Sequence, residues 1–342
     1  MFRKNVDSGI GVQAKIWDEV AGRLSYLSTT YAQVPIYYVR PDTMDEIEPP
    51  RKGFDRKCVR ETIKRIEKRS AEEERDRRPR WWETDDFDRA VEETKKRLRN
   101  SLEERWSNLS ECRRVKYCAV GVYTDDVGVI REHTGENEER AIFICPERIF
   151  KPEYAQPDII FQHVVIHELA HAYHGVTENY NKDWGEVIEE SLATAVAYLH
   201  FKNHEINPIM EFIAQQPCEY QGFTFWLYQP EIVPSSLNLW KNNRLPLYPI
   251  PICYERPIRD YFPEWRYILR KIFHFLPSRY FDKVLLYLPL LITHPFMGIY
   301  THTSIFLHDP LLLIGLLEEY AGGNYENLYK LLAMEILREG TA

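Results

Sequence analysis

The chain has 342 residues, of which 44% are hydrophobic and 28% are charged, so it is long enough to bury one large core or several smaller ones. Its formal net charge of -8 at pH 7 argues against a nucleic-acid partner, because nucleic-acid-binding proteins usually carry a basic excess.

The N-terminal segment lacks the apolar stretch of a secretory signal, and the longest apolar runs further along the chain are far shorter than a membrane span. The six cysteines form no C-x-x-C pair, and their even number alone is weak support for disulfides in a chain of this length. We therefore expect a cytoplasmic protein in a reducing compartment, with no membrane partner.

Residues 54–115 are rich in Arg, Lys and Glu and predict two helices, at 61–78 and 87–106. Apolar positions are sparse in both, so much of each helix surface must face water. We interpret this region as a solvated helical hairpin on the main body of the protein. The alternative is an arm that binds a protein partner.

Two strand-like runs follow, at 116–124 and 141–150, both rich in Val, Ile, Tyr and Phe. The polar connector between them, 125–140, makes an antiparallel pair plausible. Two apolar helices are predicted next, at 158–175, with Gly175 as its C-terminal cap, and at 186–201.

The remainder of the chain predicts an extended proline-rich loop and further helices. The loop at 230–263 is expected to line or cover the functional site. The predicted C-terminal helices are 264–276, 278–288, 310–321 and 324–339.

The segment HVVIHELAHAYHG, residues 163–175, places four histidines and one glutamate in a predicted apolar helix. His167 and His171 are four residues apart, so their imidazoles lie on one helix face and can both reach one Zn²⁺ ion. Glu168 follows the first of them and can take a proton from a metal-activated water. The H-E-x-x-H spacing therefore predicts two zinc ligands and a general base.

A catalytic zinc ion normally has three protein ligands and an open position, so a third ligand is expected. Glu190 on the following helix is the preferred candidate, because a glutamate is seldom buried without a partner. Glu189 is the rival, and Glu186 is a weaker choice. The predicted ligand set is His167, His171 and Glu190.

This pattern resembles that of the gluzincin metallopeptidases, in which H-E-x-x-H is followed by a glutamate ligand on a later helix. The segment Glu190-Ser191-Leu192-Ala193 resembles the E-G-F-A of their aminopeptidase branch. The resemblance covers about residues 141–200 and implies a zincin-type fold with a small sheet, an active-site helix and a glutamate helix. It also implies that the strand at 141–150 is the sheet edge to which an extended peptide can add.

The sequence departs from this family at defined points. Thr194 stands where thermolysin-like members carry an acidic residue, so a different partner must orient the imidazole. The G-A-M-E-N signature and the third histidine of H-E-x-x-H-x-x-G-x-x-H are both absent. His163 and His174 are interpreted as hydrogen-bonded helix residues, with a position behind the metal ligands as the alternative.

Peptide hydrolysis also needs a hydrogen-bond donor for the developing oxyanion. Tyr220, which lies beyond the glutamate helix, is the preferred candidate, and Tyr254 in the proline-rich loop is the second. Cys145 on the second strand is interpreted as a small core residue rather than a thiolate that blocks the zinc.

We therefore predict an α+β, mostly helical protein whose zincin-like core has a small antiparallel sheet and is flanked by helical regions. The expected divisions are an N-terminal region at 1–115, the core at 116–230 and a C-terminal region at 231–342. The predicted function is zinc-dependent hydrolysis of a peptide or protein substrate. The alternative is a non-catalytic or partner-recruiting interaction protein that retains the metal site.

Overall fold

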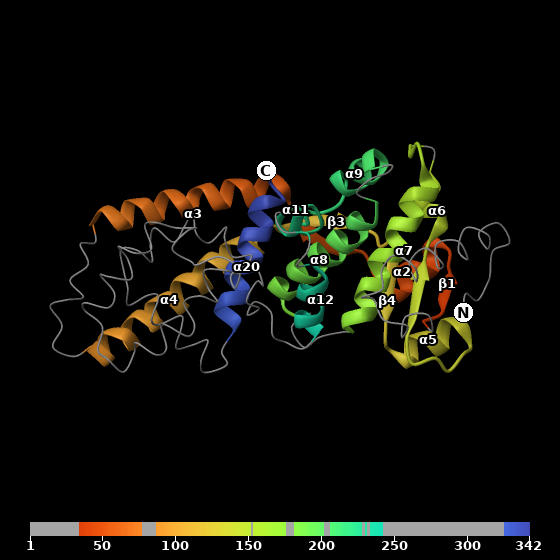
Figure 1. The fold of residues 1–342 in the computed structure, drawn as a ribbon, viewed down its shortest axis with the longest axis horizontal. Coiled ribbons are helices and arrows are strands. Elements are labelled where there is room, and N and C mark those ends of the chain that lie inside the picture. The colour runs from red at the N-terminus through yellow and green to blue at the C-terminus, as the bar shows by residue number, and fades with distance from the viewer. Residues whose placement is uncertain are drawn as a thin grey trace, which may run out of the picture. The chain divides into compact units, whose positions relative to one another are not determined.

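The computed structural model (Figure 1) describes residues 34–76, 87–151, 153–175, 181–201, 206–227, 230, 233–241 and 325–342. These parts of the chain are mostly helical and include a three-stranded mixed sheet and a two-stranded ribbon. The prediction of a mostly helical α+β protein is therefore confirmed, but the sheet is mixed rather than antiparallel.

The chain separates into two compact units, each built from segments that are distant in sequence. The first unit contains residues 1–59, 112–243 and 336–342, and the second contains residues 60–111 and 244–335. The predicted division at residues 115 and 230 stays a prediction. All residues of the candidate site belong to the first unit.

The mixed sheet has the strand order β1-β5-β4, with β1 at Ile36–Tyr38, β5 at Ala141–Ile144 and β4 at Gly121–Thr124. β5 is parallel to β1 and antiparallel to β4, and all four of its residues are buried. The expectation that 141–150 forms the sheet edge beside the cleft is thus wrong. β5 is central, and β4 is the edge strand that packs on the H-E-x-x-H helix.

Two local signals change the elements expected between residues 116 and 150. Pro146 starts the short helix α6 (Pro146–Ile149), so the second strand ends at Ile144. The supposed polar connector contains α5 (Val127–Thr134), whose N-terminus is capped by the Asp126 carboxylate and whose C-terminus is followed by Gly135. Asp126 was visible in the sequence as a possible helix cap. The apolar residues that follow it extend over only about one helical turn, so the helix was not predicted.

The predicted strand at 116–124 is divided between two sheets. β3 (Arg113–Tyr117) pairs antiparallel with β2 (Arg51–Phe54), whereas β4 pairs with β5. The short helix α2 (Pro41–Ile47) connects β1 to β2 and places Met44 in the core beside β5. The chain between β3 and β4 forms part of the wall of the candidate site.

The two apolar helices occur where they were predicted. α7 spans Pro157–His174, with a proline in its first turn and Gly175, at φ 70°, beyond its C-terminus. α8 spans Asp183–Phe201 and is buried at every position from Trp184 to Ala197. Their apolar composition reflects burial on all sides. Among the helices that the structure describes, none has the length and hydropathy needed to span a bilayer.

Among the described residues of the first unit, four short helices contact α8: α9 (Ile206–Ala214), α10 (Cys218–Gln221), α11 (Thr224–Leu227) and α12 (Val233–Lys241). α12 lies inside the stretch that was predicted to be an extended loop, which is therefore partly helical. The rest of that loop, including Tyr254 and the proposed cover of the site, lies outside the described residues.

The charged region forms two long helices, as predicted. They are α3 (Arg56–Asp76) and α4 (Phe87–Ser110), and Arg69 of α3 pairs with Glu104 of α4 at 2.7 Å. The predicted helix at 324–339 corresponds to α20 (Glu326–Glu339), whose Lys330 pairs with Glu103. The other three predicted C-terminal helices lie outside the described residues.

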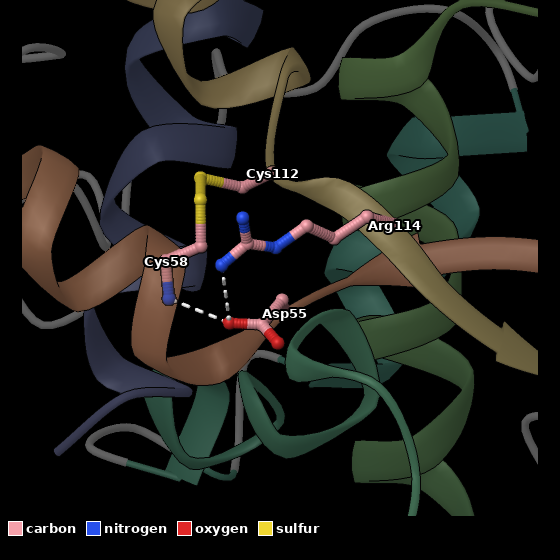
Figure 2. Close-up of a disulfide and its surroundings, with 4 residues drawn as sticks. All are labelled: Asp55, Cys58, Cys112 and Arg114. Atoms are coloured by element: carbon pink, nitrogen blue, oxygen red, sulfur yellow. Dashed lines mark hydrogen bonds and ion pairs between the residues drawn. A yellow bond between two sulfur atoms is a disulfide. The ribbon is translucent and has the colours of Figure 1, made fainter.

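A disulfide joins Cys58 to Cys112, as Figure 2 shows. The chain leaves the first unit after Val59 and re-enters it at Cys112, so the bond closes the base of the segment that carries α3 and α4. Asp55 supports this base, since its Oδ1 accepts from the backbone N–H of Cys58 at 2.6 Å and pairs with Arg114 at 3.5 Å. Structural disulfides are rare in reducing compartments, so this bond argues against the expected location.

We expect Cys58→Ser to lower the free energy of unfolding by about 2–4 kcal/mol, because the bond closes a loop of 54 residues. Urea unfolding of the variant and the wild type, with and without reductant, measures the difference. Cys118→Ser is the matched control, because Cys118 is an exposed free thiol. Equal stability of the Cys58 variant and the oxidised wild type would contradict the prediction.

Candidate metal centre

Three buried side chains from α7 and α8 converge on one point. The Nε2 atoms of His167 and His171 are 3.0 Å apart, and Oε2 of Glu190 lies 3.1 Å from the first and 3.4 Å from the second. The i, i+4 spacing places both imidazoles on the face of α7 that packs against α8. The structure thus brings together the three residues that were predicted as metal ligands.

The spacing of these atoms fits a small divalent cation. Four ligand atoms arranged tetrahedrally at roughly 2.0–2.1 Å from a zinc ion lie about 3.3 Å from one another. The three observed separations, 3.0, 3.1 and 3.4 Å, are close to this value. Two imidazoles and one carboxylate suit zinc, and such a set leaves a position open for water.

The charges of the cluster also favour a cation. Burial acts to raise the pKa of Glu190, but the two histidines oppose it and hold that pKa well below its usual range. Burial likewise acts to lower the pKa of His171, yet Glu190 raises it to about 9. A buried glutamate anion therefore requires positive charge beside it, which a divalent cation supplies without a proton on His171.

Thr194 fixes the orientation of one imidazole. Its hydroxyl donates to the backbone carbonyl of Glu190 at 2.7 Å and lies 3.3 Å from Nδ1 of His167. Because a hydroxyl has a single proton, it can only accept from an Nδ1–H group on the histidine. This contact places the lone pair of His167 on Nε2, toward the cluster. The Thr194 hydroxyl therefore orients the imidazole of His167, although the sequence has no acidic residue at this position.

We expect Thr194→Val, which keeps the shape of the side chain but removes the hydroxyl, to weaken zinc affinity about 10–100-fold. Competition with a fluorescent zinc chelator measures this affinity. Thr224→Val is the matched control, because Thr224 lies in α11 and its hydroxyl donates to the Gln221 carbonyl at 3.4 Å rather than contacting a metal ligand. Unchanged affinity in the Thr194 variant would show that His167 needs no such support.

Two neighbouring cavities open beside the cluster. The first, which we name the His171 cavity, is lined by charged and polar residues that include Glu48, Arg51, His171 and Glu189. The second, the His163 cavity, is lined by His163, Val164, His167, Thr194, Phe212, Ile213 and Gln216, among others. Both share a wall formed by Tyr117, Ala119, Gly121, Glu168 and Tyr220.

Glu168 lies in this shared wall and is 6% exposed. Burial raises the pKa of its carboxyl, while the two histidines act in the opposite direction. A Cβ atom at Gly121 of β4 would lie 2.8 Å from its Oε1 and 2.7 Å from Cγ1 of Val164. The absence of a side chain at residue 121 therefore allows the edge strand to approach Glu168 closely.

Tyr220 lies in α10 and lines both cavities, and its catalytic role stays a prediction. Its ring stacks on that of His167 with the centroids 5.7 Å apart, and Tyr117 packs edge-on against it at 6.0 Å. The sequence identified Tyr220 only by its position after the glutamate helix, whereas its contact with His167 depends on the tertiary fold.

The alternative ligands have other positions. Glu189 lines the His171 cavity but does not belong to the group of three converging ligand atoms. Glu186 pairs with Arg113 at 2.6 Å, and burial raises its pKa to about 7 despite that pairing. Cys145 is buried in the core beside β5 and lines neither cavity, in agreement with its interpretation as a core residue.

The two other histidines of the α7 segment, His163 and His174, were expected to be hydrogen-bonded helix residues. His163 is buried, but its Nδ1 has no hydrogen-bond partner within the described part of the chain, so the hydrogen-bonded interpretation is not supported. The side chain of His174 lies outside the described residues. Sequence reasoning also missed Glu219, a buried carboxyl beside Tyr220 whose pKa is raised to about 8, chiefly by burial.

Comparisons with known proteins give no match to this chain among family models, curated proteins or solved structures.

Proposed function

We propose that this protein is a zinc-dependent hydrolase that cleaves peptide bonds. The observation that carries the proposal is the buried triangle of His167, His171 and Glu190, with a second acidic side chain, Glu168, in the wall of the adjoining cavities. Structural zinc sites usually have four protein ligands, and the three found among the described residues leave a position for water. The general resemblance of the sequence to gluzincins points in the same direction.

A bound zinc ion supplies Lewis acidity, which makes water a stronger acid and polarises a carbonyl group. Glu168 takes the proton from the attacking water and delivers it to the leaving amine, and its raised pKa suits both steps. Thr194 keeps His167 in the tautomer that offers Nε2 to the ion. Tyr220, stacked on His167, is the residue proposed to donate a hydrogen bond to the developing oxyanion.

The edge strand β4 is the proposed docking element for the substrate backbone. It has no strand partner on its outer side among the described residues, and it packs along α7 beside Glu168. An extended peptide can add to such an edge through main-chain hydrogen bonds. The two neighbouring cavities beside the cluster then receive neighbouring side chains of the peptide.

The test combines metal analysis with a degenerate peptide library. We expect about one zinc ion per chain, loss of that zinc in His167→Ala, and cleavage products whose formation stops with chelator and resumes with added zinc. Zinc without cleavage of any peptide would favour the alternative of an interaction protein that retains the metal site. Absence of bound zinc under zinc-replete conditions would overturn the proposed metal centre.

A further inference from the structure

The His163 cavity differs from the His171 cavity in the charged residues that line it. Among the described residues that line it, Glu168 is the only Asp, Glu, Lys or Arg, and this group is already assigned to proton transfer. Glu48, Arg51 and Glu189 line the His171 cavity. A charged side chain entering the His163 cavity would therefore lose water without meeting an opposite charge that is free to pair with it, which is costly.

The floor of the cavity combines apolar surface with one unused polar ring. Val164, Phe212 and Ile213 supply the apolar surface, and the ring of Phe212 packs edge-on against His163 at 6.1 Å. His163 is 2% exposed, and its Nδ1 makes no hydrogen bond within the described residues. Burial lowers the pKa of His163 to about 3, with His167 acting in the same direction, so the ring is neutral at physiological pH.

A neutral imidazole has one N–H donor and one lone-pair acceptor. Leaving such groups unpaired in a buried place costs free energy, and a ligand that pairs them recovers it. The Nδ1 contact that fixes the tautomer of His167 has no counterpart at His163, so either nitrogen of this ring can carry the proton. The ring can therefore serve a donor or an acceptor that enters the cavity.

We propose that the His163 cavity is a substrate subsite for an uncharged side chain that carries an amide or a hydroxyl group, and that His163 is its specificity-determining residue. This proposal rests on the proposed peptidase function. The methylene groups of the substrate side chain pack on Val164, Phe212 and Ile213, and its polar end reaches His163. Aliphatic side chains fit the cavity but leave the imidazole unpaired, and carboxylates and ammonium groups are rejected.

The experiment uses zinc-loaded protein and two series of peptide hydroxamates, which place the side chain on one or the other side of the zinc-binding group. Each series carries Gln, Leu, Asp or Lys, and calorimetry measures the binding constants. In one series we expect Gln to bind about tenfold more tightly than Leu, because one buried polar group is paired, and Asp and Lys to bind more weakly than Leu. In the other series we expect no such order.

His163→Phe should remove the preference for Gln over Leu in that one series while zinc content stays the same. His163→Gln, which keeps a hydrogen-bonding group, should retain part of it. Glu211→Gln is the matched control on the exposed face of α9 and should leave the order unchanged. A preference that survives in His163→Phe, or the absence of any preference in both series, would overturn the subsite.

Cys118 allows a test in the wild type, should His163→Phe fail to fold. This exposed thiol lines the His163 cavity, so a bound side chain there should slow its alkylation, mapped by mass spectrometry. We expect the Gln hydroxamate to protect Cys118 at concentrations about tenfold lower than the Leu hydroxamate. Equal protection by both would overturn the proposal. Failure of all hydroxamates to bind would instead indicate that the metal centre itself is wrong.

Discussion

Glu168→Gln is expected to retain the zinc ion and to lower kcat for peptide hydrolysis about 10²–10⁴-fold, the usual effect of losing a general base. Glutamine has nearly the same shape, so it can occupy the same place against Gly121. It cannot take a proton from water, however, and it cannot return one to the leaving amine. The measurements are zinc content by mass spectrometry and steady-state kinetics on a peptide that the wild type cleaves.

Two further substitutions in α8 serve as controls. Glu189→Gln makes the same chemical change in the wall of the His171 cavity, and we expect it to keep both zinc and most of kcat. Glu190→Gln alters a member of the converging triangle, and we expect it to lose zinc. If Glu168→Gln retained the activity of the wild type, or if Glu189 and Glu190 exchanged these effects, the assignment of roles would be contradicted.

The parts of the site that depend on local spacing were accessible from the sequence. His167 and His171 share a helix face because they are four residues apart, and the apolar residues around Glu190 indicated a buried helix that needed a partner for its carboxylate. α7 and α8 also occur close to their predicted bounds, since both have a long apolar pattern and α7 has a proline and a glycine at its ends.

The parts that depend on contacts between distant residues were not accessible in this way. The central place of β5 follows from its parallel pairing with β1, about a hundred residues earlier, and no local pattern distinguishes a central strand from an edge strand when both are short. The Cys58–Cys112 bond likewise joins residues on either side of the α3–α4 segment. Cysteine number alone cannot select such a pair.

The contacts of the buried acids Glu186 and Glu219 were also not accessible from the sequence. Arg113 of β3 reaches Glu186 of α8, and Glu219 of α10 accepts from the backbone N–H of Phe54 in β2 at 3.0 Å. Each partner is at least 70 residues away in the chain. Without the fold, Glu219 is indistinguishable from an exposed glutamate in a short helix.

Glu219→Gln is expected to flatten the dependence of stability on pH. Burial raises the pKa of Glu219 to about 8, with Glu186 and Glu190 acting in the same direction, although backbone N–H groups oppose the shift. Between its ordinary value of 4.5 and about 8, the folded protein keeps a proton that the unfolded chain has lost. Raising the pH through this interval therefore favours unfolding, and stability is lost rather than gained.

For this one carboxyl, the expected decrease in the free energy of unfolding approaches 1.4 kcal/mol per pH unit and reaches roughly 4 kcal/mol by pH 8. Glutamine carries no charge and can still accept from Phe54 N–H, so Glu219→Gln should gain stability relative to the wild type as the pH rises. Urea unfolding at pH 5, 6, 7 and 8, with chelator present throughout, measures the difference.

The difference in stability between Glu219→Gln and the wild type reports on the Glu219 carboxyl, because the metal ligands and Glu186 are present in both proteins. Glu211→Gln, an exposed glutamate in α9, is the matched control and should follow the wild type at every pH. Parallel curves for Glu219→Gln and the wild type would show that the Glu219 carboxyl is ionised in the folded protein throughout this range. In that case, a cation such as Arg113 must pair with the ionised Glu219 carboxylate, because an unpaired buried charge is costly.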